Sequence, residues 1–522
     1  MMIQTKHFFL VFFAVLLLAG SVLADMTAKS VLPIAARKAP VSIETLKNAS
    51  FVGSAACVDC HPKENEKWSG TWHANMLRKI SPEIVVADFN NFEITYSDIE
   101  VLDANKQKMK ISPSIKLKKE GGDFFITLMD KDNDANNQTY NLAYVLGGNW
   151  EQQFEAQVGS MLYPTPMRWV VADKQWRLKP FSEIWWVADG TSDGRPRKPE
   201  EMQPNQGSDA KCDGCHTTGL KTVKAKNIWA LLERDAGLGI SCEKCHGPGS
   251  MHVELNTRES IINPIRLNAL QQDQVCGQCH SRVTNKIEPD LSYPLDFLPG
   301  NTDLQQRVEF WTYSTKPANF WPNEYANKNR QQYNDVQKTK HARAGITCSS
   351  CHTSHAPTRM EAGLRIASDG TCKTCHTAAS KMYEKSPMAM AGVTCTDCHM
   401  AKIANRAGST QKVKEHWDVS SHTFNVVMPY IAESYKMRSS CDSCHAGEAG
   451  TKYGLMMVER QNEIQKKIME ISTLIQKKQK SKNGLKAKEL LNAVLLDGST
   501  GAHHYMKSME LLSTSSEALS GK

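Results

Sequence analysis

Eight copies of one five-residue motif, Cys-x-x-Cys-His, constrain this chain more than any other feature of its sequence. The copies begin at residues 57, 212, 242, 276, 348, 372, 395 and 441. Together they use all sixteen cysteines, so no thiol is left over. A chain that repeats one arrangement of two thiols and an imidazole in this way must fold around the chemistry of that arrangement.

Three kinds of site use Cys-x-x-Cys pairs. Sixteen cysteines in a secreted chain could form disulfides, but a disulfide gives no reason for a histidine after every second cysteine. Zinc sites combine two such pairs or add distant histidines, and they do not require an imidazole beside the second thiolate. Attachment of c-type haem needs all three residues, because two thiols bond the porphyrin edge and the next imidazole binds the iron. We therefore predict eight covalently bound c-type haems.

The thiols predicted to bond the porphyrins are Cys57, Cys60, Cys212, Cys215, Cys242, Cys245, Cys276, Cys279, Cys348, Cys351, Cys372, Cys375, Cys395, Cys398, Cys441 and Cys444. The imidazoles predicted to bind the irons from the proximal side are His61, His216, His246, His280, His352, His376, His399 and His445. Only 40% of the residues are hydrophobic and 7% aromatic, which is little for a conventional core of this size. The haems themselves are expected to form much of the interior.

The sixth coordination position of each iron decides between electron transfer and catalysis, because a vacant position can bind a substrate. The chain has seventeen histidines, of which eight are proximal and His7 lies in a predicted signal peptide. The eight that remain match the number needed for two histidines at every iron. These candidate distal ligands are His73, His252, His341, His355, His416, His422, His503 and His504. No residue is predicted to be catalytic.

Several segments resemble the multihaem cytochrome c superfamily, which includes pentahaem nitrite reductase, octahaem hydroxylamine oxidoreductase and many electron carriers. They are "CHGPGSMH", "HARAGITCSSCHTSH", "GVTCTDCHM", "SSHTF" and "GAHHYMKSMELL", and the resemblance covers roughly residues 51–515. It implies that six histidines occupy distal-ligand positions: His73, His252, His341, His355, His422 and His503. Relatives commonly have asparagine where His504 stands, so His504 and His416 match the family pattern less well.

The sequence before the fifth motif is repeated before the seventh, with one exchange. His341 stands seven residues before Cys348, and Met388 takes the same place before Cys395. A methionine thioether can bind haem iron and raises its reduction potential relative to histidine. Alternatively, Met388 is an apolar residue beside the porphyrin and another histidine completes the iron. The sequence leaves both interpretations open.

The spacing of the motifs predicts a multihaem cytochrome c fold, made mainly of short helices and irregular loops wrapped around eight haems. Residues 1–24 have the layout of a secretory signal peptide, and residues 25–82 form an N-terminal segment around the first haem. Residues 83–211 contain no motif and show the alternation of antiparallel strands, which predicts a β-rich insertion between haems 1 and 2. Residues 212–448 form a seven-haem core, and residues 449–522 are predicted to form C-terminal helices.

Runs such as "FEITYSDIEVL", "FFITLMD" and "TYNLAYVLGG" in the β-rich insertion are predicted to form antiparallel strands and turns. Four tryptophans that follow are expected to pack in the core, with contact to a haem face as the alternative for one or two: Trp169, Trp176, Trp185 and Trp186. In the C-terminal region, isoleucines recur at helical spacing up to Ile475, and "SKNG" and "DGSTG" interrupt the helical pattern. "HHYMKSMELL" is predicted to be a last, short helix.

The formal net charge of +8 does not indicate a nucleic-acid partner, because haem propionates would balance most of it. The signal peptide predicts a secreted protein, periplasmic or extracellular at the cell surface, with no membrane span after processing. Its expected partners are redox partner proteins or extracellular electron acceptors. The apolar stripe of the C-terminal helices also fits a homo-oligomer or a larger cytochrome assembly.

These features favour a secreted electron carrier in which electrons pass along a chain of mostly bis-histidine haems. The alternative is an octahaem oxidoreductase that acts on a small nitrogen or sulfur compound at one five-coordinate haem. Nitrite reductases of the superfamily usually mark the catalytic haem with Cys-x-x-Cys-Lys, which this chain lacks. Hydroxylamine oxidoreductase uses only Cys-x-x-Cys-His and adds a tyrosine cross-link, for which Tyr453 and Tyr505 can be nominated but not argued.

Overall fold

The computed structural model describes most of the chain after residue 45. The described residues are 46, 48–97, 99–102, 108–112, 114–179, 184–187, 195–225, 228–232, 237–355, 363–366, 369–405, 417–445, 447–478 and 480–520. The predicted signal peptide and His416 lie outside them. Among the helices that are described, none combines the length and the apolar character needed to cross a bilayer.

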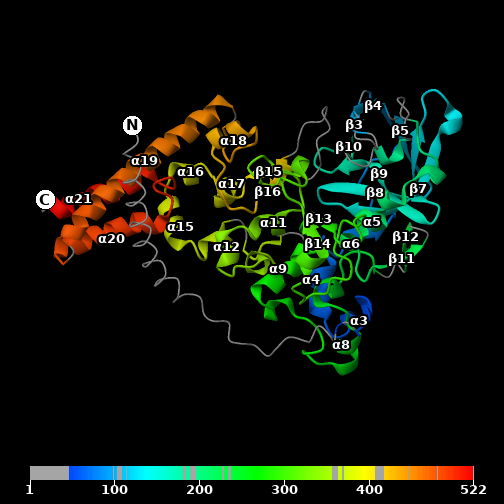
Figure 1. Ribbon diagram of the computed structural model, residues 1–522, viewed down its shortest axis with the longest axis horizontal. Helices are drawn as coiled ribbons and strands as arrows, with labels where there is room; N and C mark the ends of the chain where they lie inside the picture. The colour runs from blue at the N-terminus through cyan, green and yellow to red at the C-terminus, as the bar shows by residue number, and fades with distance from the viewer. Residues whose placement is uncertain are drawn as a thin grey trace. The chain divides into compact units, whose positions relative to one another are not determined.

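An antiparallel sheet of eight strands follows the first motif (Figure 1). Its strands run in the order β10-β9-β8-β7-β6-β5-β2, and β1 pairs with β7. The bounds are β1 (Leu77–Lys79), β2 (Phe92–Thr95), β5 (Ser114–Glu120), β6 (Asp123–Met129), β7 (Gln138–Gly147), β8 (Glu151–Val158), β9 (Met161–Val170) and β10 (Gln175–Leu178). The predicted β-rich region between the first two motifs is thereby confirmed.

One of the runs predicted to form strands and turns contains two strands with different partners. "FEITYSDIEVL" forms two strands: β2, which pairs with β5, and β3 (Ile99–Leu102), which pairs with β4 (Lys108–Ile111) in a separate two-stranded sheet. The alternation of apolar residues changes phase at this point, from Phe92, Ile94 and Tyr96 to Ile99 and Val101, so the sequence does carry a signal of the break. The runs "FFITLMD" and "TYNLAYVLGG" lie within β6 and β7 except for their last residues, and these two strands pair in the sheet.

The sheet has its own apolar core. Along β6 every second side chain is buried, beginning with Phe124, as a strand with one covered face requires. Trp169, Trp176 and Trp186 belong to this core, and Trp185 packs against it half-buried. The tryptophans therefore serve packing, as predicted.

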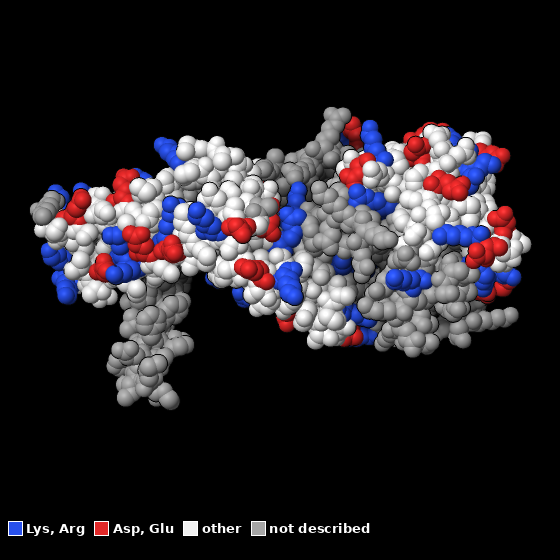
Figure 2. Space-filling model, turned by 90° about the horizontal axis from the view of Figure 1, so that it is seen from above, with Lys and Arg blue, Asp and Glu red and all other residues white. Residues whose placement is uncertain are grey.

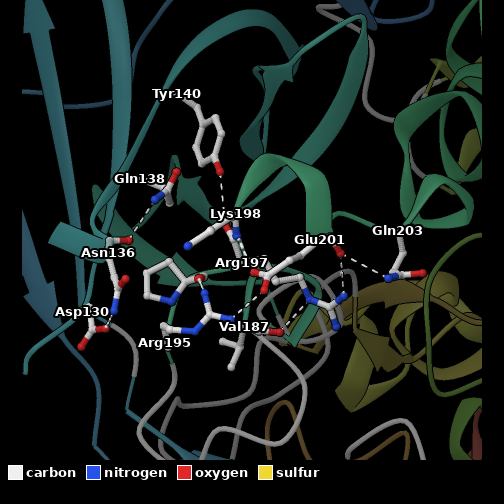
Figure 3. Close-up of polar contacts among 11 residues, drawn as sticks. Asp130, Asn136, Gln138, Tyr140, Val187, Arg195, Arg197, Lys198, Glu201 and Gln203 are labelled. Carbon is white, nitrogen blue, oxygen red and sulfur yellow. Dashed lines mark hydrogen bonds and ion pairs between the residues drawn. The ribbon is translucent and has the colours of Figure 1, made fainter. Parts of the chain in front are cut away.

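The segment that leads from the sheet to the second motif is held by polar contacts around Arg197 and Glu201 (Figure 3). The Arg197 guanidinium donates to the carbonyl oxygens of Val187 (2.7 Å) and Glu201 (3.1 Å). The Tyr140 hydroxyl, from β7, donates to the Arg197 carbonyl at 3.3 Å. Arg195 and the Lys198 backbone N–H each donate to a different carboxylate oxygen of Glu201, both at 2.8 Å. These bonds fix the approach of the chain to Cys212.

The motifs lie on short helices and turns. The helices of this part are α3 (Ala55–Val58), α4 (Pro62–Ser69), α5 (Ser208–Lys211), α6 (Asp213–His216), α7 (Cys242–His246), α8 (Ser250–Leu255), α9 (Ala269–Gly277), α10 (Leu304–Arg307), α11 (Gln332–Val336), α12 (Lys340–Arg343), α13 (Cys348–Cys351), α14 (Gly370–Lys373), α15 (Thr377–Tyr383), α16 (Pro387–Met390), α17 (Cys395–His399) and α18 (Pro429–Tyr435). The hairpins among them are β11 (Lys221–Ala225) with β12 (Ile228–Leu232), β13 (Val283–Asn285) with β14 (Val308–Phe310), and β15 (Lys402–Asn405) with β16 (Trp417–Ser420). Apolar clusters here are small, such as that of Ala210, Cys215, Leu291 and Tyr293.

Three longer helices end the chain: α19 (Glu448–Lys477), α20 (Lys482–Asp497) and α21 (Tyr505–Ser520). They pack side by side (Figure 1), with Ile464 and Ile468 of α19 buried against Leu491 of α20 and Leu512 of α21. The Ser481 hydroxyl accepts a hydrogen bond from the Gly484 N–H and so begins α20 after the predicted break. The C-terminal helices are confirmed, although the last is sixteen residues long and begins after the two histidines.

Charged side chains of both signs are interspersed over the described surface (Figure 2). Lysine and arginine alternate with aspartate and glutamate on this face and form no broad field of one sign. Such a surface differs from the basic stripe that a nucleic-acid-binding domain presents.

Candidate metal centre

Six proximal histidines each face one of the predicted distal histidines. Their ring centres lie 5.9 to 6.4 Å apart. The pairs are His61 with His252, His280 with His73, His246 with His355, His376 with His341, His352 with His422, and His399 with His503. All six histidines that the family resemblance singled out are thus opposite a motif histidine.

This spacing fits one metal ion between two imidazoles. An imidazole nitrogen lies about 2 Å from its metal ion and about 1.1 Å from its own ring centre, so two opposed rings have centres about 6 Å apart. Direct stacking of two imidazoles would bring the rings closer. The His246 and His355 rings, for example, are parallel to within 3° yet 6.2 Å apart. The residues present therefore fit a haem iron at each of the six positions.

Hydrogen bonds from Nδ1 orient several of these rings. The Nδ1 atoms of His246 and His252 bond the carbonyl oxygens of Ile262 (2.7 Å) and Thr257 (2.8 Å). Those of His399 and His422 bond the carbonyl oxygens of Phe424 and Ser420, at 3.2 and 3.1 Å. A carbonyl acceptor holds the proton on Nδ1 and leaves Nε2 free to bind a metal ion.

Burial favours the neutral form of several paired imidazoles, as metal ligation requires. It is the main cause that lowers the pKa of His280 and the pKa of His422, each to about 4. Burial also lowers the pKa of His73 below its usual value. Neutral imidazole is the form that binds iron.

Two proximal histidines differ from the other six. Neither His216 nor His445 faces another histidine ring among the described residues. The ring nearest to His445 is that of Tyr453, with centres 4.5 Å apart. His504 faces no motif histidine among the described residues, and its Nδ1 accepts a hydrogen bond from the Lys507 N–H at the start of α21. His416 lies outside the described residues.

Three cationic side chains, one buried and two half-buried, act on His216. Burial, and then the charges of Arg330, Lys179 and Lys244, lower the pKa of His216 to about 3. The Lys244 ammonium donates to the Gly214 carbonyl at 2.7 Å, and burial lowers the pKa of Lys179. The backbone of Arg330 lies in the left-handed region, with φ of 65°, an unusual conformation for a non-glycine residue. Sequence reasoning missed this cluster because its members lie far apart in the chain.

Close side-chain contacts between cysteines join different motifs. They connect Cys57 with Cys242, Cys215 with Cys279, Cys276 with Cys348, and Cys372 with Cys395. No disulfide joins any of the sixteen cysteines. The described residues also contain no group of three or more His, Cys, Asp and Glu side chains that converge on one point, as a zinc site would need. The thiols instead bring the edges of neighbouring motifs together.

Three further contacts complete the connections between motifs. Burial, followed by Cys276, raises the pKa of Cys245 to about 12. Burial, followed by Cys372 and Cys375, raises the pKa of Cys351, and burial, followed by Cys441, raises the pKa of Cys398 to about 11. In order along these contacts, the motifs run first, third, fourth, fifth, sixth, seventh and eighth. The second motif joins this line at the fourth.

Comparison with known proteins gives relatives of one kind. The family described as "Cytochrome c554 and c-prime" matches residues 56–110 and 174–247. Dissimilatory sulfite reductase MccA of Wolinella succinogenes is 24% identical over 324 residues, which cover 58% of this chain and 41% of that protein. The chain therefore spans less than half of the length of this curated relative.

Solved structures give the fold. The outer cell wall cytochrome OcwA has a TM-score of 0.66 and 23% identity, and the match covers 90% of this chain and 99% of that one. An undecahaem cytochrome from the S-layer of Carboxydothermus ferrireducens has a TM-score of 0.49 and 17% identity, covering 91% of this chain and 70% of that one. This chain has a multihaem cytochrome fold, and the resemblance to the multihaem cytochrome c superfamily that its motifs predicted is confirmed.

Proposed function

We propose that this protein is an octahaem cytochrome c that transfers electrons along a chain of haems. The observation that carries the proposal is the spacing of the six histidine pairs, which fits two axial imidazoles on each of six irons. Two strong ligands close an iron to substrates and suit it to accept and release single electrons. Each haem is bonded by the two thiols of its motif, and the motif histidine is its proximal ligand.

The contacts between motifs supply the route. Haems bonded to adjoining thiols have adjoining edges, so electrons pass through the first, third, fourth, fifth, sixth, seventh and eighth haems in that order. Residues far apart in sequence make these steps, such as Cys57 with Cys242 and Cys276 with Cys348. The chain itself contributes axial ligands, Nδ1 partners that orient them, and a shell that keeps water from the porphyrins.

The route has two ends, at the first and the eighth haem, and therefore suits transfer between two partners. We propose that the protein acts outside the cytoplasm and exchanges electrons with redox proteins or an extracellular acceptor. The mixed charge of the described surface in Figure 2 favours brief encounters over one strongly charged docking site.

Mass and magnetic spectroscopy of the purified protein test this proposal. We expect an intact mass that exceeds the polypeptide by eight haems, and low-spin ferric signals from the six bis-histidine irons. The His341→Ala variant should convert one low-spin signal into a high-spin signal, because the sixth haem loses its distal imidazole. It should also slow electron delivery to a soluble ferric chelate, since that haem lies in the middle of the route. Fewer than eight haems, or no change in this variant, would contradict the assignment.

A second function is favoured by the surroundings of His216. The haem of His216 joins the route only as a side branch at the fourth haem. No second imidazole among the described residues faces His216. Arg330, Lys179 and Lys244 place positive charge beside this haem. Cations at a substrate-accessible iron would stabilise a small oxyanion and the negative charge that develops during its reduction. The relative named as a sulfite reductase makes sulfite the first anion to test.

Titration with sulfite distinguishes the two functions. If the iron of His216 binds an anion, sulfite will shift a high-spin ferric signal, and Arg330→Gln will weaken that binding at least tenfold. Arg343→Gln, which alters an exposed arginine outside this cluster, is the matched control. If His416 is instead the sixth ligand, the wild-type signal will be low-spin and insensitive to sulfite. The His416→Ala variant will then create the high-spin signal.

A further inference from the structure

The segments before the fifth and seventh motifs form the same capped turn. Thr339 caps α12 by accepting a hydrogen bond from the Ala342 N–H at 3.3 Å, and Ser386 caps α16 by accepting one from the Ala389 N–H at 3.1 Å. After each helix, a backbone N–H returns a hydrogen bond to the carbonyl oxygen of the helix's second residue. The Ile346 N–H donates to the His341 carbonyl and the Val393 N–H donates to the Met388 carbonyl, both at 3.0 Å. His341 and Met388 therefore occupy the same place in two copies of one structure.

A third copy of this cap shows what the position does. Thr71 accepts a hydrogen bond from the Ala74 N–H at 3.2 Å, and His73 lies between them. His73 faces the motif histidine His280 with ring centres 6.1 Å apart and planes at 76°. His341 faces His376 at 5.9 Å and 80°. In both histidine-bearing copies, the residue two places after the capping hydroxyl is thus directed at a proximal histidine.

The contacts of the motifs identify the proximal histidine that corresponds to Met388. The Cys348 N–H donates to Asp273 at 2.8 Å, and the Cys395 N–H donates to Asp369 at 2.9 Å. Each aspartate stands three residues before the first cysteine of the preceding motif. The fifth motif is therefore held on the fourth as the seventh is held on the sixth.

The second cysteines of the fifth and seventh motifs also have corresponding neighbours, each in the next motif. Cys351, the second cysteine of the fifth motif, lies beside Cys372 and Cys375 of the sixth. Cys398, the second cysteine of the seventh motif, lies beside Cys441 and Cys444 of the eighth. His341, before the fifth motif, faces the histidine of the sixth. The same relationship predicts that Met388, before the seventh motif, faces the histidine of the eighth, His445.

For the haem of His445, the other candidate ring ligands fit poorly as the sixth ligand. The ring of Tyr453 is only 4.5 Å from that of His445, a separation that leaves no room for an iron between them. His504 is engaged as the N-cap of α21 through its Nδ1. Met388 is half-buried, whereas Met390, on the same turn, is 76% exposed.

We infer that the thioether sulfur of Met388 is the sixth ligand of the haem bonded at Cys441 and Cys444. The inference rests on the proposed function, since it requires that the eighth motif holds a haem. Replacement of an axial imidazole by a thioether raises the reduction potential of haem iron. The exchange of histidine for methionine therefore makes the last haem of the route its most oxidising one. Electrons that enter elsewhere collect there, at the end from which they leave.

Substitution of Met388 tests the inference. The oxidised wild-type protein is expected to show the charge-transfer absorption of a ferric iron–thioether bond, and Met388→Leu should abolish it and produce one new high-spin signal. Met388→His should restore a low-spin iron without this band and lower the highest reduction potential of the protein. Met390→Leu, on the same turn, should change neither property. Intact mass is measured for every variant.

The outcomes separate this inference from the proposed function. If Met388→Leu retains eight haems and leaves the absorption and spin state unchanged, methionine ligation is wrong while the octahaem assignment stands. If the wild-type protein carries no haem at the eighth motif, the proposed function fails first. A high-spin signal that appears in His504→Ala, and not in Met388→Leu, would assign the ligand to His504 and overturn the inference.

Discussion

The Nδ1 atom of His503 lies 2.6 Å from a carboxylate oxygen of Asp497, to which it donates a hydrogen bond. Asp497 is the last residue of α20 and its side chain is fully buried, while His503 faces the proximal histidine His399. The Nδ1 atoms of His246, His252, His399 and His422 bond carbonyl or hydroxyl oxygens instead, so the His503 ring has the more strongly basic partner. A carboxylate partner makes the imidazole a stronger electron donor to its iron.

The first prediction concerns this carboxylate. Asp497→Asn should raise the reduction potential of the seventh haem, because a less basic imidazole stabilises ferric iron less. A tenfold loss in preference for the ferric state corresponds to about 59 mV for one electron. Potentiometric titration followed by electron paramagnetic resonance measures the shift. Glu510→Gln, an exposed change on α21, should leave every potential in place, and an unchanged midpoint in Asp497→Asn would contradict the assignment.

The second prediction separates ligand histidines from structural ones. His355→Ala should open the third haem and yield a high-spin ferric signal that cyanide converts to low spin, because its ring is the one opposite His246. His504→Ala should give no such signal. It should instead lower the stability of the C-terminal helices by about 0.5–2 kcal/mol, the usual effect of removing an N-cap. Equal spin changes in both variants would show that the ring spacing does not identify ligands.

The chemistry held within each short motif could be predicted from the sequence, but contacts between segments that are distant in the sequence could not. The thiols and proximal imidazoles were recognisable because one short motif contains all the atoms that hold one haem. The pairing of His61 with His252 was not, because it depends on how segments 191 residues apart in the chain meet, as Val52 and Glu243 do. Asp273 and Asp369, which cap later motifs, carried a signal that was missed: each precedes a Cys-x-x-Cys pair by three residues.

The fold divides in the same way. Alternation in "FFITLMD" predicted a strand, and β6 is one, because one face of the sheet must bury its side chains. The break between β2 and β3 carried a local signal that was missed, because the alternation changes phase between Tyr96 and Ile99, but which strand each half pairs with is set by the fold. The last helix was predicted to begin at His503, but His504 is engaged as its N-cap and the helix begins at Tyr505.

The third prediction addresses the polar junction of Figure 3. Arg197→Ala should lower the free energy of unfolding by about 1.5–3 kcal/mol, because buried carbonyl oxygens of Val187 and Glu201 lose a charged donor. Arg195→Ala removes a more exposed ion pair to the same glutamate and should cost about 1 kcal/mol or less. Thermal unfolding followed by far-ultraviolet circular dichroism compares the two. The order of the two melting temperatures is the decisive result, and its reversal would refute a structural role for Arg197.

The fourth prediction concerns Gly214, between the cysteines of the second motif. A Cβ atom at this position would lie 2.1 Å from ring carbons of Tyr293, whose hydroxyl donates to the Asp209 carbonyl at 2.8 Å. The buried ring cannot give way without breaking that bond, so Gly214→Ala should cost about 1–3 kcal/mol by overpacking. Because the displaced backbone carries Cys212 and Cys215, a fraction of the molecules should also lack one haem in the intact mass spectrum.

A control and a rescue make this prediction specific. Gly122→Ala, in a turn where no atom lies within 4 Å of the added carbon, should leave both stability and haem content unchanged. The double variant Gly214→Ala/Tyr293→Leu removes the ring that the new methyl group strikes, and should recover haem attachment at the second motif while leaving a smaller cost from the lost hydrogen bond. If the double variant attaches no more haem than Gly214→Ala alone, the glycine is needed for a reason other than contact with Tyr293. The tight packing of the second motif would then not explain its glycine.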